Sequence, residues 1–202
     1  MLGIYKFSLW LLVVSLFVLL AWVVFLWEPH PGIGGHTGLE VSDAPTGGEF
    51  TLQSADGVVA LSDFRGKAVV IYFGYTWCPD ICPTSLGYLT AALNELSPGE
   101  LASVQGLFIS VDPERDTLDR LKRYGEYFHA RIRGITGRPE VVREIASRYG
   151  ASYAKAEQKS ETDYVVDHSS ALYLIDKDGR LARILLHGTP PVEIYEALKK
   201  LI

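Results

Sequence analysis

Cysteine is scarce in this chain, and positive charge is nowhere concentrated. Only two of the 202 residues are cysteines, Cys78 and Cys82, so no third thiol is available to pair with either one. Lysine and arginine number 19 against 24 acidic residues, the formal net charge is -5, and the basic residues form no run. This composition argues against a basic surface for nucleic acid, and we expect no nucleic-acid partner. The chemistry is expected at the single pair of thiols.

Charge is also absent from one long segment near the N-terminus. The run Phe7–Trp27 has 21 residues interrupted only by serines, and as a helix it is long enough to cross a hydrocarbon core of ~30 Å. Only bulky residues follow Ala21, which argues against a cleavage site, so residues 1–27 are predicted to be a transmembrane signal anchor. Lys6 precedes the run and no basic residue follows it until Arg65. The positive-inside rule therefore predicts a single-pass protein of a bacterial inner membrane, with its C-terminal domain in the periplasm.

Beyond this segment the composition changes twice. Residues 28–47 are rich in glycine, proline and histidine without hydrophobic periodicity, which is typical of a flexible linker. Residues 48–202 form the predicted domain, which begins with two extended runs, Phe50–Gln53 and Val58–Leu61, joined by an Asp-Gly turn. Strands and helices then alternate in an order that predicts an α/β, thioredoxin-like fold with an added N-terminal β-hairpin, preceded by one transmembrane helix. The strands are expected at Ala68–Tyr75, Val104–Asp112, Ile132–Thr136, Ser152–Ala156, Ser170–Ile175 and Leu181–Leu186, and the helices at Pro83–Leu96, Thr117–Phe128, Pro139–Tyr149 and Pro191–Leu201.

The two cysteines lie where a predicted strand gives way to a predicted helix. Cys78 follows the apolar run that ends at Tyr75, and the helical pattern begins near Cys82. Backbone N–H groups and the positive end of the helix dipole favour thiolate over thiol at such a junction. Three residues separate the cysteines, whereas a thioredoxin redox site has two between them. The longer spacing can close a disulfide or spread two sulfurs around one ion, so redox exchange and metal ligation both stay open.

Proline is missing from the long stretch between Pro139 and Pro190. Thioredoxin-like oxidoreductases commonly place a cis-proline before the strand that faces the cysteines. Here His168 directly precedes the run expected to form that strand, so we expect an imidazole where such enzymes have proline. Because soft thiolates with one imidazole select Cu(I) over harder ions, Cys78, Cys82 and His168 are predicted to be metal ligands.

Three groups of residues closely resemble the motifs of the Sco/SenC family. They are Phe73–Pro83, Val111–Thr117, and Asp163–Ser169 together with Tyr173–Asp176. The resemblance covers roughly residues 48–202, with the motifs in order. Members of that family are membrane-anchored, thioredoxin-like copper chaperones for cytochrome c oxidase assembly. The resemblance implies that copper is held by Cys78, Cys82 and His168, with Cu(I) expected and Cu(II) left open.

Acidic residues flank the predicted ligands. Asp80 and Asp167 could each accept a hydrogen bond beside the metal, with Asp167 assisting the imidazole, whereas Asp80 could instead satisfy only the N–H groups of its turn. Asp112 and Asp116, with Arg115 between them, follow a central strand near the same face. Their charges could meet a partner, but we expect them to cap the following helix.

Two functions follow from these residues. The leading prediction is a metallochaperone, not an enzyme, which holds copper outside the cytoplasm and delivers it to the CuA site of cytochrome c oxidase subunit II. Other periplasmic copper carriers and a thiol reductant are expected as further partners. The alternative is an extracytoplasmic thiol–disulfide oxidoreductase, in which Cys78 and Cys82 are a redox-active pair that reduces the CuA cysteines or senses redox state. The two functions can coexist, because the sulfurs must be reduced before they bind metal.

Overall fold

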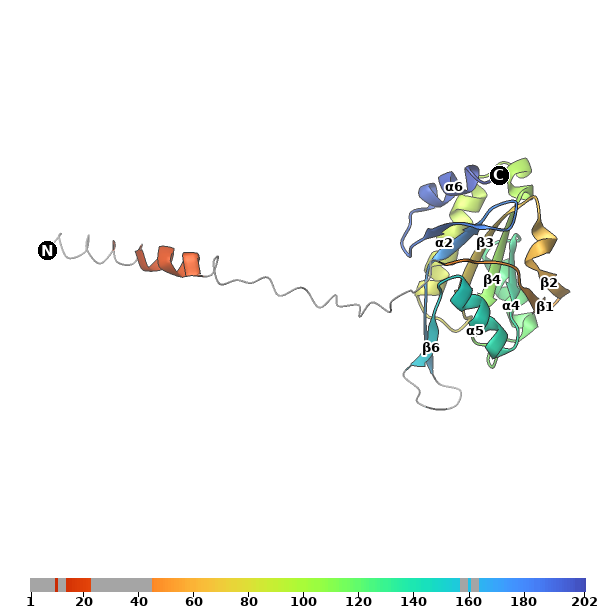
Figure 1. Cartoon of the computed structure of the whole chain (residues 1–202), viewed down its shortest axis with the longest axis horizontal. Coiled ribbons are helices and arrows are strands. Elements are labelled where there is room, and N and C mark those ends of the chain that lie inside the picture. The colour runs from red at the N-terminus through yellow and green to blue at the C-terminus, as the bar shows by residue number, and fades with distance from the viewer. Residues whose placement is uncertain (1–9, 11–13, 23–44, 157–159, 161–163) are drawn as a thin grey trace. The chain divides into compact units, whose positions relative to one another are not determined.

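The computed structural model describes residue 10 and residues 14–22, 45–156, 160 and 164–202. The chain divides into two units, Met1–Val41 and Ser42–Ile202, and Figure 1 shows the second as a sheet with helices packed around it. The described residues of the first unit are helical. Within the described residues, no helix is both long enough and apolar enough to span a membrane. The expected anchor at 1–27 and the expected linker at 28–47 fall mostly outside these residues.

A five-stranded sheet forms the middle of the domain. Its strands, in sheet order, are β5 (Ile132–Ile135), β4 (Val104–Ser110), β3 (Ala68–Gly74), β8 (Leu172–Ile175) and β9 (Leu181–Leu185). β3, β4 and β5 run parallel, whereas β8 is antiparallel to β3 and β9 is antiparallel to β8. All seven residues of β3 are buried, because this central strand is covered on both faces. That burial explains its continuous apolar sequence.

Apolar elements cover both faces of this sheet (Figure 1). One face is covered by the buried sides of α2 (Ile81–Asn94), α4 (Leu118–Phe128) and α6 (Pro191–Lys199). The other face is covered by α5 (Pro139–Arg148) and by an antiparallel hairpin of β1 (Thr51–Ser54) and β2 (Gly57–Ala60). Two short helices, η1 (Leu61–Phe64) and α3 (Pro98–Ala102), lie in the connections. The end of β3 therefore lies at the centre of a sheet that is packed on both faces.

A separate two-stranded sheet carries the predicted histidine. β6 (Tyr153–Ala156) pairs antiparallel with β7 (Val165–His168). Within the described residues, neither strand belongs to the five-stranded sheet. The sequence did not predict β7: His168 was expected just before a strand, and it is instead the last residue of one, opposite Tyr153. Strand pairing within the five-stranded sheet therefore does not by itself fix the position of this histidine.

The other strands and the long helices of the domain are confirmed with shifted ends, but one expected role is wrong. Asp112 and Asp116 do not cap the helix that follows them. The N-cap of α4 is Thr117, whose side chain accepts the N–H of Arg120 at 3.3 Å. Asp112 and Asp116 are 2% and 1% exposed, and both carboxylates are committed to buried hydrogen bonds.

Candidate metal centre

The end of β3 and the start of α2 bring the two cysteines together. Cys78 lies in the loop between these elements, and Cys82 lies in the first turn of α2. Gly74, the last residue of β3, leaves room for the second sulfur. A Cβ atom at this position would lie 2.7 Å from the Cys82 Sγ atom and 3.0 Å from the Phe108 ring. A glycine is therefore required here for the buried sulfur to sit beside the strand.

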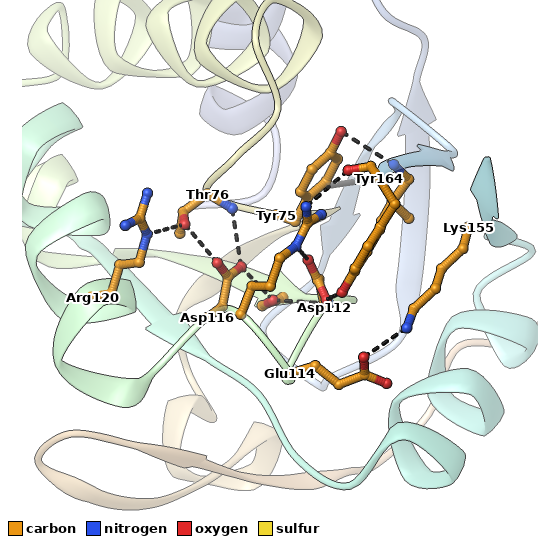
Figure 2. A network of polar contacts seen from close by, with 11 residues as sticks. Tyr75, Thr76, Asp112, Glu114, Asp116, Arg120, Lys155 and Tyr164 are labelled. Carbon is orange, nitrogen blue, oxygen red and sulfur yellow. Dashed lines mark hydrogen bonds and ion pairs between the residues drawn. The ribbon is translucent and has the colours of Figure 1, made fainter. Parts of the chain in front are cut away.

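The cysteine loop is anchored to a buried carboxylate. Asp116 Oδ2 accepts the N–H of Thr76 at 3.0 Å and the Ser110 hydroxyl at 2.6 Å, and its Oδ1 accepts the Thr76 hydroxyl at 2.5 Å (Figure 2). Arg120 donates from Nε to the same threonine hydroxyl. The Arg120 guanidinium carbon also lies 4.2 Å from the centroid of the Trp77 ring. The two residues that lead into the first cysteine are therefore held in place.

The two sulfurs and the His168 imidazole converge. One ligand atom from each residue lies within 4.8 Å of the other two. The Cys82 Sγ atom is 3.3 Å from His168 Nε2, and the Cys82 backbone N–H donates to the Cys78 Sγ atom at 3.4 Å. Cys82 and His168 are 86 residues apart, but β8, which follows the histidine, is paired with β3, which leads into the cysteine loop. The structure thus brings together the three residues that the sequence singled out.

Packing and hydrogen bonding orient the imidazole. His168 Nδ1 lies 3.0 Å from the carbonyl oxygen of Ser169. Because a carbonyl only accepts, this contact places the proton on Nδ1 and leaves the lone pair of Nε2 pointing toward the sulfurs. The ring also meets Tyr72 and Tyr75 edge to face, with centroid separations of 6.0 and 5.8 Å. The sequence did not indicate a role for either tyrosine, although both lie in the run that leads into Cys78.

The two thiols have opposite protonation preferences. A hydrogen bond from the Cys82 thiol, supported by backbone N–H groups and opposed by burial, lowers the pKa of Cys78 to about 3. Burial, together with the neighbouring Cys78 thiolate, raises the pKa of Cys82. Cys78 is therefore the sulfur that ionises first, and Cys82 keeps its proton. A metal ion that takes both sulfurs must displace the Cys82 proton.

A cavity of about 450 Å³ opens in front of the three ligands. The loop and β7 line it with Tyr75, Cys78–Ile81 and Val165–His168. Cys78 and His168 are partly exposed, whereas Cys82 is fully buried. An ion that enters from the cavity therefore meets Cys78 and His168 first.

Asp80 and Asp167 both line this cavity, Asp80 from the cysteine loop and Asp167 from β7. The Asp80 carboxylate accepts the Thr84 hydroxyl at 3.3 Å, and its backbone N–H contributes to the low pKa of Cys78. Asp167 is exposed on β7. In the described part of the chain, neither carboxylate has a hydrogen bond to a cysteine or to His168, whose Nδ1 contacts a backbone carbonyl instead.

The donor atoms determine which metal suits this site. Two sulfurs and one imidazole nitrogen are soft or borderline ligands, and among the residues that the structure describes no carboxylate belongs to the convergent group. Such a set favours a soft cation such as Cu(I) over Mg²⁺ or Ca²⁺, which prefer oxygen. The fold and the site together define a thioredoxin-like protein in which two cysteines and one histidine converge.

Comparison with known proteins identifies the family. The chain belongs to the SCO1/SenC family, whose model matches residues 40–202. It is 40% identical over 156 residues to the mitochondrial SCO2 homolog of Bos taurus. That match covers 76% of this chain and 58% of the bovine protein, so the chain spans a little over half the length of this relative.

Solved structures agree with this assignment. ScoI of Bradyrhizobium japonicum, solved with copper bound, has 36% sequence identity and a TM-score of 0.70, with 77% of this chain and 99% of that chain covered. BsSco, described as a member of the Sco family of cytochrome c oxidase assembly proteins with a disulfide switch, has 27% identity and a TM-score of 0.60. In this second match, 77% of this chain and 92% of the other are covered. The thioredoxin-like Sco fold is therefore shared with both.

Proposed function

We propose that this protein is a copper chaperone that delivers copper to the CuA site of cytochrome c oxidase subunit II. The observation that carries the proposal is the convergence of Cys78, Cys82 and His168 within 4.8 Å of one another. These three residues are the proposed copper ligands, and Asp80 and Asp167 are proposed to act beside them at the rim of the cavity. The copper in the related ScoI structure supports this choice of metal.

The cavity in front of the three ligands supports the proposal that copper is delivered to an acceptor. Cu(I) held by two thiolates and one imidazole leaves an open side toward the cavity, where thiolates of the acceptor can replace the donor sulfurs one at a time. No electrons move in this exchange, and Cys82 recovers its proton when its sulfur is released. Other periplasmic copper carriers would load the site, and a thiol reductant would keep Cys78 and Cys82 reduced.

The proposed location is the periplasmic face of a bacterial inner membrane. Residues 1–27 are the proposed single-pass anchor, residues 28–47 the linker and residues 48–202 the copper-binding domain. Lys6 before the apolar run, with no basic residue after it until Arg65, supports this orientation. A reporter fused after Ile202 tests it: activity of a cytoplasm-only reporter, with none from a periplasmic one, would overturn the topology.

Two substitutions test copper delivery in cells. His168→Ala removes the imidazole and keeps both thiols, so oxidase activity at limiting copper should fall steeply and recover partly with added copper. Cys82→Ser should abolish activity, because Cu(I) then keeps only one thiolate beside the imidazole and is held too weakly for delivery. The control is His129→Ala, which removes an imidazole that does not belong to the convergent group. His129 lies at the end of α4, where its Nδ1 accepts the Arg131 N–H at 3.0 Å. Normal oxidase activity in His168→Ala cells at limiting copper would refute delivery through this site.

A second candidate function is thiol–disulfide exchange, which the low pKa of Cys78 favours. The Cys78 thiolate would attack one sulfur of a substrate disulfide and free the other as a thiolate, which takes the Cys82 proton. The Cys82 thiolate would then attack Cys78 and release the second substrate sulfur as a thiolate, which takes a proton from water. The substrate gains two electrons, and the Cys78–Cys82 pair becomes a disulfide. His168→Ala should leave such exchange at a comparable rate, whereas Cys82→Ser should abolish it.

A further inference from the structure

β7, which carries His168, is not a strand of the central sheet. Within the described residues its only strand partner is β6. Strand pairing alone therefore does not set the distance between the imidazole and the two sulfurs. The Tyr72 ring of β3 meets the imidazole edge to face. Further contacts come from the loop that follows β4, residues 112–116, and from the residue that follows β3, Tyr75 (Figure 2).

Asp112 and Arg115 bind the residue that immediately precedes β7. Asp112 Oδ1 accepts the Tyr164 hydroxyl at 2.6 Å, and Asp112 Oδ2 accepts Arg115 Nε at 2.5 Å. Arg115 Nη1 donates to the Tyr164 carbonyl oxygen at 2.8 Å, and its guanidinium carbon lies 3.5 Å from the centroid of the Tyr164 ring. Tyr164 is 4% exposed and is thus held at its hydroxyl, its ring face and its backbone. Hydrogen bonds to buried charged groups are the strong ones.

Tyr75 provides a second attachment two residues further along. Its hydroxyl accepts the N–H of Val166 at 3.3 Å, and its ring meets the His168 ring edge to face. The Arg115 guanidinium carbon lies 5.5 Å from the centroid of the Tyr75 ring. The 112–116 loop therefore contacts both Tyr164, which precedes β7, and Tyr75, which precedes Thr76.

One loop thus holds both ligand-bearing segments through different residues. Asp116 fixes the backbone that leads to the cysteines, and Asp112 with Arg115 fixes the strand that ends at the histidine. Loop residues 112–116 lie close to the end of β4 in the sequence, and β4 is paired with β3. The position of the loop is therefore set by the central sheet. The same loop therefore contacts both the segment that leads to the cysteines and the segment that ends at the histidine.

We propose that Asp112, Arg115 and Tyr164 form a positioning clamp, which sets the β7 imidazole at coordination distance from the two sulfurs. The proposal rests on the copper ligands proposed above. Its consequence is selective: the clamp governs what the histidine contributes to copper affinity and leaves the dithiol unaffected. A residue that stabilised only the fold would not separate these two properties.

Tyr164→Phe is the test variant, because it removes one hydroxyl and keeps the ring under Arg115. Replacing Asp112 or Arg115 would leave a buried charge without its partner and endanger folding. The matched control is Tyr153→Phe on β6, whose hydroxyl donates to the Pro139 carbonyl at 3.3 Å outside the clamp. Cu(I) affinity of the reduced full chain is measured by competition with a chelator of known affinity, and the potential of the Cys78–Cys82 disulfide by equilibration with glutathione.

If the clamp acts in this way, Tyr164→Phe should lower the Cu(I) affinity about tenfold, which is the smallest loss typical of removing a group that orients a metal ligand. The disulfide potential should not change. In a His168→Ala background the same substitution should have almost no effect, because the imidazole it orients is gone. Tyr153→Phe should match the wild type in both measurements.

Three results would overturn the clamp. The first is unchanged copper affinity in Tyr164→Phe, and the second is an equal loss in the presence and absence of the imidazole. In either case His168→Ala alone would still lower the affinity, and the proposed function would stand. The third is unchanged affinity in His168→Ala itself, which would remove the proposed ligand and the clamp together.

Discussion

At the scale of single residues, the site depends on how little space surrounds Cys82. Its sulfur is fully buried and lies against Gly74, where any Cβ atom would approach to 2.7 Å. A contact this short has to be relieved by movement of the sulfur or of the strand. Copper affinity and stability are therefore coupled at this glycine.

Gly74→Ala should lower the free energy of unfolding by about 1 to 3 kcal/mol and weaken Cu(I) binding, because the added methyl group displaces Cys82 from its partners. Urea unfolding and chelator competition measure the two effects. The control is Gly87→Ala in α2, where a Cβ atom would meet nothing within 4 Å. Alanine there should stabilise the helix by about 0.5 to 1 kcal/mol. If both variants bound copper like the wild type, the close approach of Gly74 to Cys82 would be irrelevant to the site.

At the scale of elements, hydrophobic patterns predicted the structure well where burial is uniform. β3 and β4 are seven-residue strands with every residue buried, and both were predicted to be buried strands, β3 from its continuous apolar sequence. β7 was missed because only Val166 in it is buried, so its four residues carry no clear pattern. α3 was also missed, although Ser97 and Glu100 form a capping box around a proline at its first turn.

The loop after β4 shows why charged residues were misread. Asp116 was expected to cap a helix, since acidic residues are common at that position, and it is instead 1% exposed with three donors around it. A sequence does not distinguish a carboxylate at a helix start from one that folds back under a neighbouring loop.

Asp116→Ala should therefore cost about 3 kcal/mol or more in the free energy of unfolding, because a buried N–H and two buried hydroxyls lose their acceptor. Thr117→Ala, which removes the observed cap of α4, should cost only about 1 kcal/mol. Both values come from urea unfolding followed by tryptophan fluorescence. Equal losses in the two variants would mean that Asp116 does no more than a helix cap.

At the scale of the whole molecule, the three convergent residues could be predicted because the topology is common to thioredoxin-like chains. A cysteine loop after β3 and a histidine before β8 must lie close together, since these strands are neighbours in the sheet. The supports of the site could not be predicted in the same way. Asp112 and Arg115 contact Tyr164, which immediately precedes β7, and the sequence did not indicate that strand.

The proposed copper delivery and the proposed clamp both depend on the identity of the copper ligands. X-ray absorption of the reduced full chain loaded with one equivalent of Cu(I) measures them directly. We predict two sulfur neighbours and one imidazole nitrogen, from Cys78, Cys82 and His168, with one sulfur lost in Cys82→Ser and the imidazole lost in His168→Ala. A copper ion surrounded only by nitrogen and oxygen, with no sulfur neighbour, would show that Cys78 and Cys82 do not bind copper.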